Sequence, residues 1–165
     1  MRLGFSGLLV GLALGLAAGE ADAGCSDVPA PGVDYGRCQL DGMVLAGVDL
    51  TGADLRYASF KRADLSEAVL VDVEARKAKF VSATMRDVVF DDASLFETDF
   101  TRSDLQGASF KGADLYRTRF FRADLRGADF TGASLRDTDF LHAELTGATW
   151  VDGETTCGEG RSEEH

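Results

Sequence analysis

A large apolar residue falls on nearly every fifth position of the sequence between residues 40 and 150. Most members of this series are Leu or Phe, and a small or β-branched residue, usually Ala, stands two positions before each. Five residues advance an α-helix by about 500°, so such a series would circle a helix, and on a strand it would alternate between faces. A short period that persists over so long a stretch therefore predicts a solenoid, in which each repeat packs on its neighbours.

Individual repeats add a family resemblance to this pattern. Ala53-Asp54-Leu55 and residues 123–127 (Ala-Asp-Leu-Arg-Gly) resemble the A-[DN]-L-x-x unit of the pentapeptide-repeat family, and similar units fill most of residues 40–150. The resemblance implies an all-β fold, a right-handed quadrilateral β-helix in which four pentapeptides form one square coil.

The apolar series sorts by residue type when the chain is read in steps of twenty. Phe dominates two columns that would face each other across a four-sided coil, and Leu dominates the two columns between them. A three-sided coil would mix the two types. We expect about six coils over residues 39–152, and hence a rod roughly 27 Å long at the usual strand spacing. Ala75 is the one small member of the series, so we expect the weakest packing there and Ala75→Leu to be neutral or stabilising.

The first 23 residues resemble a secretory signal peptide. Arg2 gives a positive start, residues 3–18 are apolar or small, and Ala21-Asp22-Ala23 matches the A-x-A cleavage pattern. We therefore expect a secreted or periplasmic chain that begins at Gly24 and has no stable membrane span. Two alternatives remain open: an uncleaved N-terminus on a cytosolic protein, and a lipoprotein modified at Cys25, which the polar residue three positions before it disfavours.

The three cysteines lie outside the regular series. Residues 24–38 contain Cys25, Cys38 and both prolines of the chain, a composition that predicts an N-terminal cap closed by a disulfide between these two cysteines. Cys157 lies past the last coil, too far along the rod to reach them, so we expect an unpaired thiol or a bond to another molecule or a small thiol. Residues 153–165 are polar and are predicted to form a disordered tail.

Outward positions would carry any function of such a rod. One predicted face is basic, the next two faces around the coil are acidic, and the fourth is close to neutral. The cations of this basic strip are Lys61, Arg62, Lys79, Arg102, Arg119 and Arg122. The strip has two interpretations: a surface that binds anions, or a solvated face whose long side chains cover the strand edges. The acidic columns do not resemble a calcium-binding loop, and we expect no metal and no cofactor.

Aromatic residues provide the second surface signal. Phe96 and Tyr116 fall in one outward column, and Phe121 and Leu141 fall in the next, around a corner. Together they could form an apolar patch of the kind that marks a partner or homodimer contact, although scattered exposed aromatics are also ordinary.

The sequence offers little for catalysis, because His142 and His165 are its only histidines and neither belongs to a recognisable catalytic constellation. We therefore predict a non-catalytic, secreted or periplasmic scaffold or protein–protein interaction module with an unknown protein partner. The family resemblance implies an alternative, a DNA mimic that inhibits a type II topoisomerase. The basic strip and the signal peptide oppose that alternative, and we expect no nucleic-acid partner.

Overall fold

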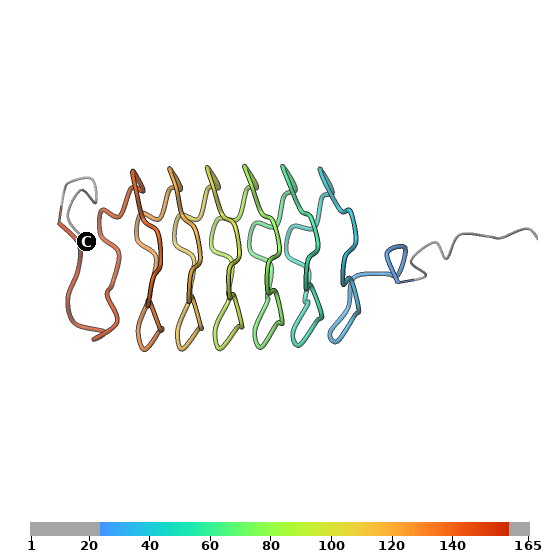
Figure 1. Ribbon diagram of the computed structural model, residues 1–165, viewed down its shortest axis with the longest axis horizontal. Helices are drawn as coiled ribbons and strands as arrows, with labels where there is room; N and C mark the ends of the chain where they lie inside the picture. The colour runs from blue at the N-terminus through green and yellow to red at the C-terminus, as the bar shows by residue number, and fades with distance from the viewer. Residues whose placement is uncertain (1–23, 159–165) are drawn as a thin grey trace, which may run out of the picture.

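The structure is a computed structural model that describes residues 24–158. The chain winds through a stack of similar coils along the axis of a rod (Figure 1). Within these residues there is no helix and no extended strand; each side of a coil is a single bridge residue between two turns. Bridges pair in parallel with the residue twenty positions later, from Asp34↔Asp54 to Asp129↔Thr149. The coil therefore has the four sides of the predicted right-handed quadrilateral β-helix.

The corner of each repeat is a tight turn with an unusual backbone conformation. The turn closes when an N–H donates to the carbonyl oxygen three residues earlier, as from Ala63 to Phe60 at 3.1 Å. The second turn residue has a positive φ at every corner from Gly32 to Gly147, including +58° at Arg62. This region strains residues other than glycine. Packing of successive coils therefore imposes the same turn on very different side chains.

The aspartates before the central apolar residues cap these turns. Asp54 accepts a hydrogen bond from the backbone N–H of Arg56 at 3.0 Å, and Asp129 accepts one from the N–H of Thr131 at 2.9 Å. This Asx-type bond satisfies a turn N–H that the bridges leave free. The acidic columns thus have a structural role that their charge alone did not indicate.

The core contains the predicted columns of rings. Phe80 stacks on Phe60 and on Phe100 with ring centroids 5.1 Å apart in both pairs. The facing column stacks in the same way, with Phe90 and Phe110 at 5.6 Å, and the two columns meet edge to face. Stacked and edge-to-face pairs each add about 0.5–1.5 kcal/mol beyond the burial of area.

The coil at Ala75 departs from its neighbours in a compensated way. Ala75 is fully buried in the column that holds Leu55 and Leu95. Val73, two positions earlier, is also fully buried, at a position where most repeats carry Ala. The coil that lacks a leucine side chain at Ala75 therefore has extra buried methyl groups at Val73.

The β-helix starts earlier than the predicted residue 39. Asp34 bridges to Asp54, and the N–H of Gly32 donates to the carbonyl oxygen of Thr51 at 2.8 Å. Tyr35 is only 2% exposed and continues the column of Leu55. The cap and the first coil therefore overlap, because the chain between Val33 and Tyr35 already has the small–Asp–large order of a repeat despite its proline- and glycine-rich surroundings.

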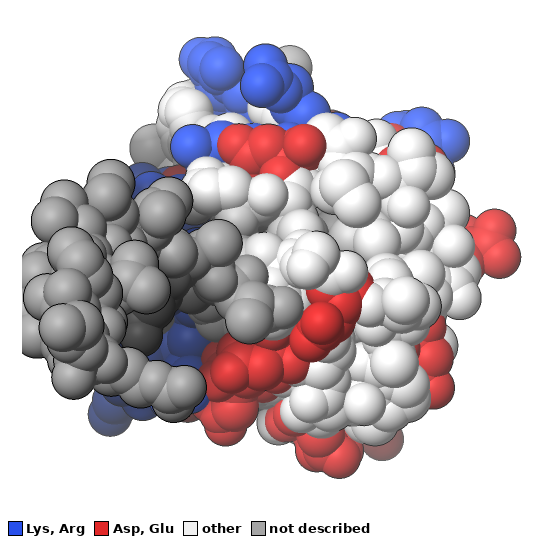
Figure 2. All heavy atoms as spheres, turned by 90° about the vertical axis from the view of Figure 1, so that its right-hand side faces the viewer, with Lys and Arg blue, Asp and Glu red and all other residues white. Residues whose placement is uncertain are grey.

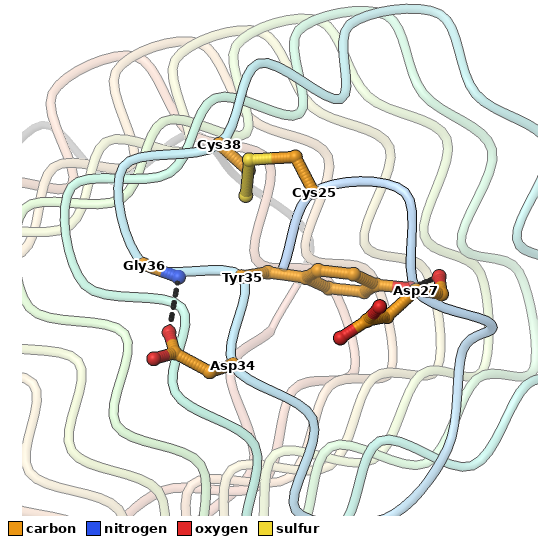
Figure 3. The surroundings of a disulfide bond; sticks show 6 residues. All are labelled: Cys25, Asp27, Asp34, Tyr35, Gly36 and Cys38. Carbon is orange, nitrogen blue, oxygen red and sulfur yellow. Dashed lines mark hydrogen bonds between the residues drawn. A yellow bond between two sulfur atoms is a disulfide. The ribbon is translucent and has the colours of Figure 1, made fainter. Parts of the chain in front are cut away.

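The predicted disulfide between Cys25 and Cys38 is present, with Cα atoms 5.4 Å apart. Figure 3 shows Tyr35 extending beneath this bond toward the start of the described chain, where its hydroxyl donates to the carbonyl oxygen of Asp27 at 2.7 Å. In the same view the N–H of Gly36 donates to the side chain of Asp34. The disulfide and the tyrosine together hold the cap on the first coil.

The predicted disordered tail is wrong for its first part. Thr156 forms an antiparallel bridge with Thr149, and Cys157 both donates to the carbonyl oxygen of Ala148 and accepts from the N–H of Gly147, at 2.8 Å each. The last coil would otherwise expose its backbone edge, which explains why polar sequence folds back on it. Cys157 is half-buried and is a free thiol whose pKa is raised by burial. The predicted signal peptide and residues 159–165 lie outside the described residues.

Candidate functional site

The described surface is a set of columns and shallow grooves. Residues 24–158 include no helix long and apolar enough to cross a membrane. Among the same residues no group of three or more His, Cys, Asp and Glu side chains is placed to hold a metal ion. Viewed from the N-terminal end, Lys and Arg gather mainly along the upper edge and Asp and Glu mainly along the lower edge (Figure 2). The rod is therefore electrostatically unequal around its circumference.

The structure breaks the predicted basic strip into separate environments. Lys61 and Arg62 share one corner, and in the next coil Ser82 occupies the place of Arg62 before Arg102 and Arg122 follow. Arg119 lies on the adjoining side of the coil, between two carboxylates rather than among cations. Its guanidinium nitrogens are 3.9 Å from both Asp99 and Asp139.

Phe96 and Tyr116 are ring neighbours on successive coils. Their ring centroids are 5.4 Å apart and their planes are tilted by 40°. Arg76 covers the outer face of Phe96 at 5.0 Å, and Arg136 covers Tyr116 at 4.3 Å. We call Arg76, Phe96, Tyr116 and Arg136 the aromatic row. Sequence reasoning missed its two arginines, although their spacing of twenty residues from the rings was a usable signal.

Phe121 belongs to a different part of the surface. Its ring meets His142 edge to face at 5.7 Å and carries the guanidinium of Arg122 at 5.1 Å. Leu141, in the same column, is 52% exposed. The aromatic residues predicted as one patch thus form two groups on either side of a row of charges.

That row of charges consists of two parallel ladders. The corner ladder is Lys77, Glu97, Arg117 and Asp137, and the side ladder is Lys79, Asp99, Arg119 and Asp139. Along the corner ladder, ion pairs join Lys77 to Glu97 at 3.3 Å and Glu97 to Arg117 at 3.7 Å. A groove of about 470 Å³ runs between the ladders over Ala78 and Thr98.

The floor of this groove has no free hydrogen-bonding side chain. Thr98 donates its hydroxyl to the carbonyl oxygen of Ala75 at 2.8 Å, as Thr118 in the next coil does to Leu95 at 2.7 Å. No buried side-chain nitrogen or oxygen in the described part of the chain lacks a partner. Any recognition in the groove would therefore depend on the charged walls.

Comparisons with known proteins fit this architecture. One family model, described as a pentapeptide repeat region, matches residues 44–120, and a second, described as pentapeptide repeats (8 copies), matches residues 113–149. A search of the curated proteins found no match.

Three solved structures illustrate the similarity. HetL, a pentapeptide repeat protein involved in heterocyst differentiation regulation from the cyanobacterium Nostoc sp. strain PCC 7120, is 27% identical over 74% of this chain and 64% of its own, with a TM-score of 0.49. Rfr23 from the cyanobacterium Cyanothece 51142 is 22% identical over 71% of this chain and 90% of its own, with a TM-score of 0.42. A pentapeptide repeat protein from the Arabidopsis thaliana thylakoid lumen is 30% identical over 65% of this chain and 64% of its own, with a TM-score of 0.33.

The two family matches together extend from residue 44 to residue 149, over coils that share one turn, one bridge and one core column per side. The chain therefore belongs to the pentapeptide-repeat family.

Proposed function

We propose that this protein is a non-catalytic scaffold that binds a partner protein through the aromatic row. The observation that carries the proposal is the contact of two partly exposed rings, with centroids 5.4 Å apart, between two arginines. Tyr, Phe and Arg are the residue types enriched in protein interfaces, and Tyr and Arg are frequent among the residues that dominate binding energy.

The row is held rigidly before any partner arrives. The carbonyl oxygen of Phe96 accepts from the N–H of Lys77, and the carbonyl oxygen of Tyr116 accepts from the N–H of Glu97, both at 3.0 Å. Each ring also contacts the other and is covered by an arginine. Little conformational entropy remains to be lost on binding, which favours affinity.

The chemistry of the row points to an acidic partner segment with apolar side chains. Arg76 and Arg136 end the row, and Arg117 lies 4.9 Å from the Tyr116 ring centroid. A carboxylate of the partner would meet these guanidinium groups while its apolar side chains cover the ring edges.

We further propose that the protein acts in a secreted or periplasmic location. The sequence of residues 1–23 supports this, and so does the bond between Cys25 and Cys38, because disulfides persist in oxidising compartments. A DNA-mimic role ranks second. A mimic needs a dense run of negative charge, whereas the two ladders alternate in sign and the aromatic row carries cations.

The test is the affinity of a double variant, Phe96→Ser with Tyr116→Ser. A partner captured from the extracytoplasmic fraction of the host is identified by mass, purified and titrated against each variant. We expect a loss of affinity of more than about tenfold, as interface hot spots show. Tyr57→Ser is the control, because Tyr57 is 49% exposed and lies at the same corner of the rod, in the column of Lys77 rather than in that of the two rings. Equal affinity of the double variant and the control would refute the aromatic row as the contact.

A further inference from the structure

Charges on one side of the rod alternate in sign from coil to coil. In each coil the corner ladder and the side ladder contribute one charge of the same sign, and we call such a pair of residues a rung. The rungs are Lys77 with Lys79, Glu97 with Asp99, Arg117 with Arg119, and Asp137 with Asp139. Read along the axis, the signs are plus, minus, plus, minus. Read in the opposite direction, the signs are minus, plus, minus, plus, so each rung has the opposite sign to the rung at the same place in the forward order.

A third column completes this side of the rod. Val81, Thr101, Phe121 and Leu141 lie at the corner that follows the side ladder, and their carbonyl oxygens accept from the N–H of the residue nineteen positions earlier, as Phe121 accepts from Arg102 at 2.9 Å. We call these four residues the apolar column. Leu141 is exposed and the other three are partly exposed.

We propose that this side of the rod binds a second copy of the chain in an antiparallel arrangement. The two-fold axis would pass between the rung of Glu97 and Asp99 and the rung of Arg117 and Arg119. Each positive rung then faces a negative rung of the second copy. Such an interface is isologous, since the same patch serves both subunits, and the complementary charges fix its register.

The apolar column fits the same arrangement. A two-fold axis that lies across the side reverses the axial order but keeps each column opposite itself. Val81 would face Leu141 of the second copy, and Thr101 would face Phe121. The apolar column, of which Thr101 is the one polar member, thus meets itself along one edge of the contact, while opposite charges meet at the four rungs.

The spacing of the rungs selects this partner over an extended peptide or a nucleic acid. Successive coils are roughly 4.8 Å apart, the spacing of hydrogen-bonded strands. Side chains on one face of an extended strand recur every ~6.8 Å and would fall out of step with the rungs. A nucleic acid backbone carries one sign of charge and would meet repulsion at the rungs of Glu97 with Asp99 and of Asp137 with Asp139. A second copy has the matching period and the matching signs.

Ion pairs within one chain leave the two arginines of the ladders largely exposed to solvent. Three of the pairs at Arg117 and Arg119 have nitrogen–oxygen distances of 3.9 Å, and those arginine side chains are 54% and 60% exposed. The contact spans four coils, about 19 Å of rod. That is smaller than a standard interface, so we expect a reversible dimer with a dissociation constant in the micromolar to millimolar range.

The test uses two charge-reversed variants and their mixture. One variant carries Lys77→Asp and Lys79→Asp, and the other carries Asp137→Lys and Asp139→Lys. Each homodimer would place like charges opposite each other, whereas a heterodimer of the two would restore every opposite-charge contact. Phe96 and Tyr116 stay unchanged, so failure here leaves the proposed partner site untouched. Each variant is expressed in the host from the full sequence, including residues 1–23, and is purified as the host processes it. Circular dichroism checks that it is folded.

Analytical ultracentrifugation at low salt gives the outcome. We expect the parent to dimerise, each variant alone to be monomeric or weakened more than about tenfold, and the equimolar mixture to regain the parent's dissociation constant. If the ladder charges interact only within their own chain, the mixture would not dimerise more strongly than either variant alone. A parent that stays monomeric up to millimolar concentration, variants that dimerise as the parent does, or a mixture that stays monomeric would each overturn the proposal.

Discussion

The hydroxyl of Tyr35 donates a hydrogen bond to the carbonyl oxygen of Asp27 at 2.7 Å and so ties the start of the cap to the first coil. Tyr35 is also a core residue, 2% exposed. Replacing Tyr35 by Phe keeps the ring and removes the bond, so we expect a loss of about 1 kcal/mol in the free energy of unfolding. Urea titration measures it. Tyr57→Phe, at an exposed corner, should leave stability unchanged, and equal losses in both variants would refute a specific role for the Tyr35 bond.

The disulfide should contribute more than this hydrogen bond. Cys25 and Cys38 are separated by 13 positions, and a loop of this size predicts about 3 kcal/mol of stabilisation through the unfolded state. We expect the double variant Cys25→Ser with Cys38→Ser to lose roughly that amount in chemical unfolding. Cys157→Ser is the control for removal of a thiol and should change stability much less. A double variant as stable as the parent would show that the cap holds without the bond.

Stability should fall in acid because aspartates cap the turns. Hydrogen bonds from the side chains of Arg56 and Arg126 are the main cause that lowers the pKa of Asp54 and Asp124, and the Ser66 side chain does the same for the pKa of Asp64. A pKa that is lower in the folded chain than in the unfolded one stabilises the fold above the unfolded value of about 3.9. This contribution is lost as the pH falls through the folded pKa.

Melting temperature against pH measures this effect. We expect a nearly constant value from neutral pH down to about 5 and a decline below about 4. Replacing Asp54, Asp64 and Asp124 by Asn keeps an oxygen that can accept from the turn N–H but removes the titration, so the acid decline should become shallower. An unchanged acid decline in the triple Asn variant would assign acid sensitivity to other groups.

The coil at Ala75 offers a packing test. Val73 and Ala75 are both fully buried, and we expect Val73→Ala alone to cost about 1–3 kcal/mol, since it enlarges a site that already lacks a leucine. Adding Ala75→Leu to Val73→Ala restores the common pattern with nearly the same total volume, so the double variant should unfold within about 1 kcal/mol of the parent. Chemical unfolding of both variants measures the two values. If Val73→Ala left the free energy of unfolding unchanged, the valine would not compensate for the small side chain of Ala75.

Much of the fold could be predicted because its core residues recur at a fixed spacing along the sequence. The stacking of Phe80 on Phe60 and Phe100 follows directly from the spacing of twenty residues. Both ends were harder. The prolines and glycines around Tyr35 interrupt the repeat pattern, so the first coil could not be recognised from it. Thr156 pairs with Thr149 because the last coil has unpaired backbone groups, and these do not depend on the pattern of side chains.

The surface was predicted less well, for a related reason. Column membership placed Phe96 beside Tyr116, and the same spacing of twenty residues could have added Arg76 and Arg136. The prediction put Arg119 on one face with Asp99 and Asp139, but the sequence could not show that its guanidinium lies between these two carboxylates. Face charge was counted without the hydrogen bonds that make many aspartates part of the turns. A long side chain on the surface of a solenoid can reach several neighbouring residues. Only the three-dimensional structure shows which of these contacts it forms.

Photochemical cross-linking from position 116 tests the central claim most directly. A photoreactive phenylalanine analogue in place of Tyr116, in the host that makes the protein, should yield an adduct of discrete mass with a different protein, and the same analogue in place of Tyr57 should not. An adduct with a second copy of the chain would be recognised by its mass and would not count as the partner. Absence of an adduct at position 116, or the same adducts from positions 116 and 57, would contradict binding through the aromatic row.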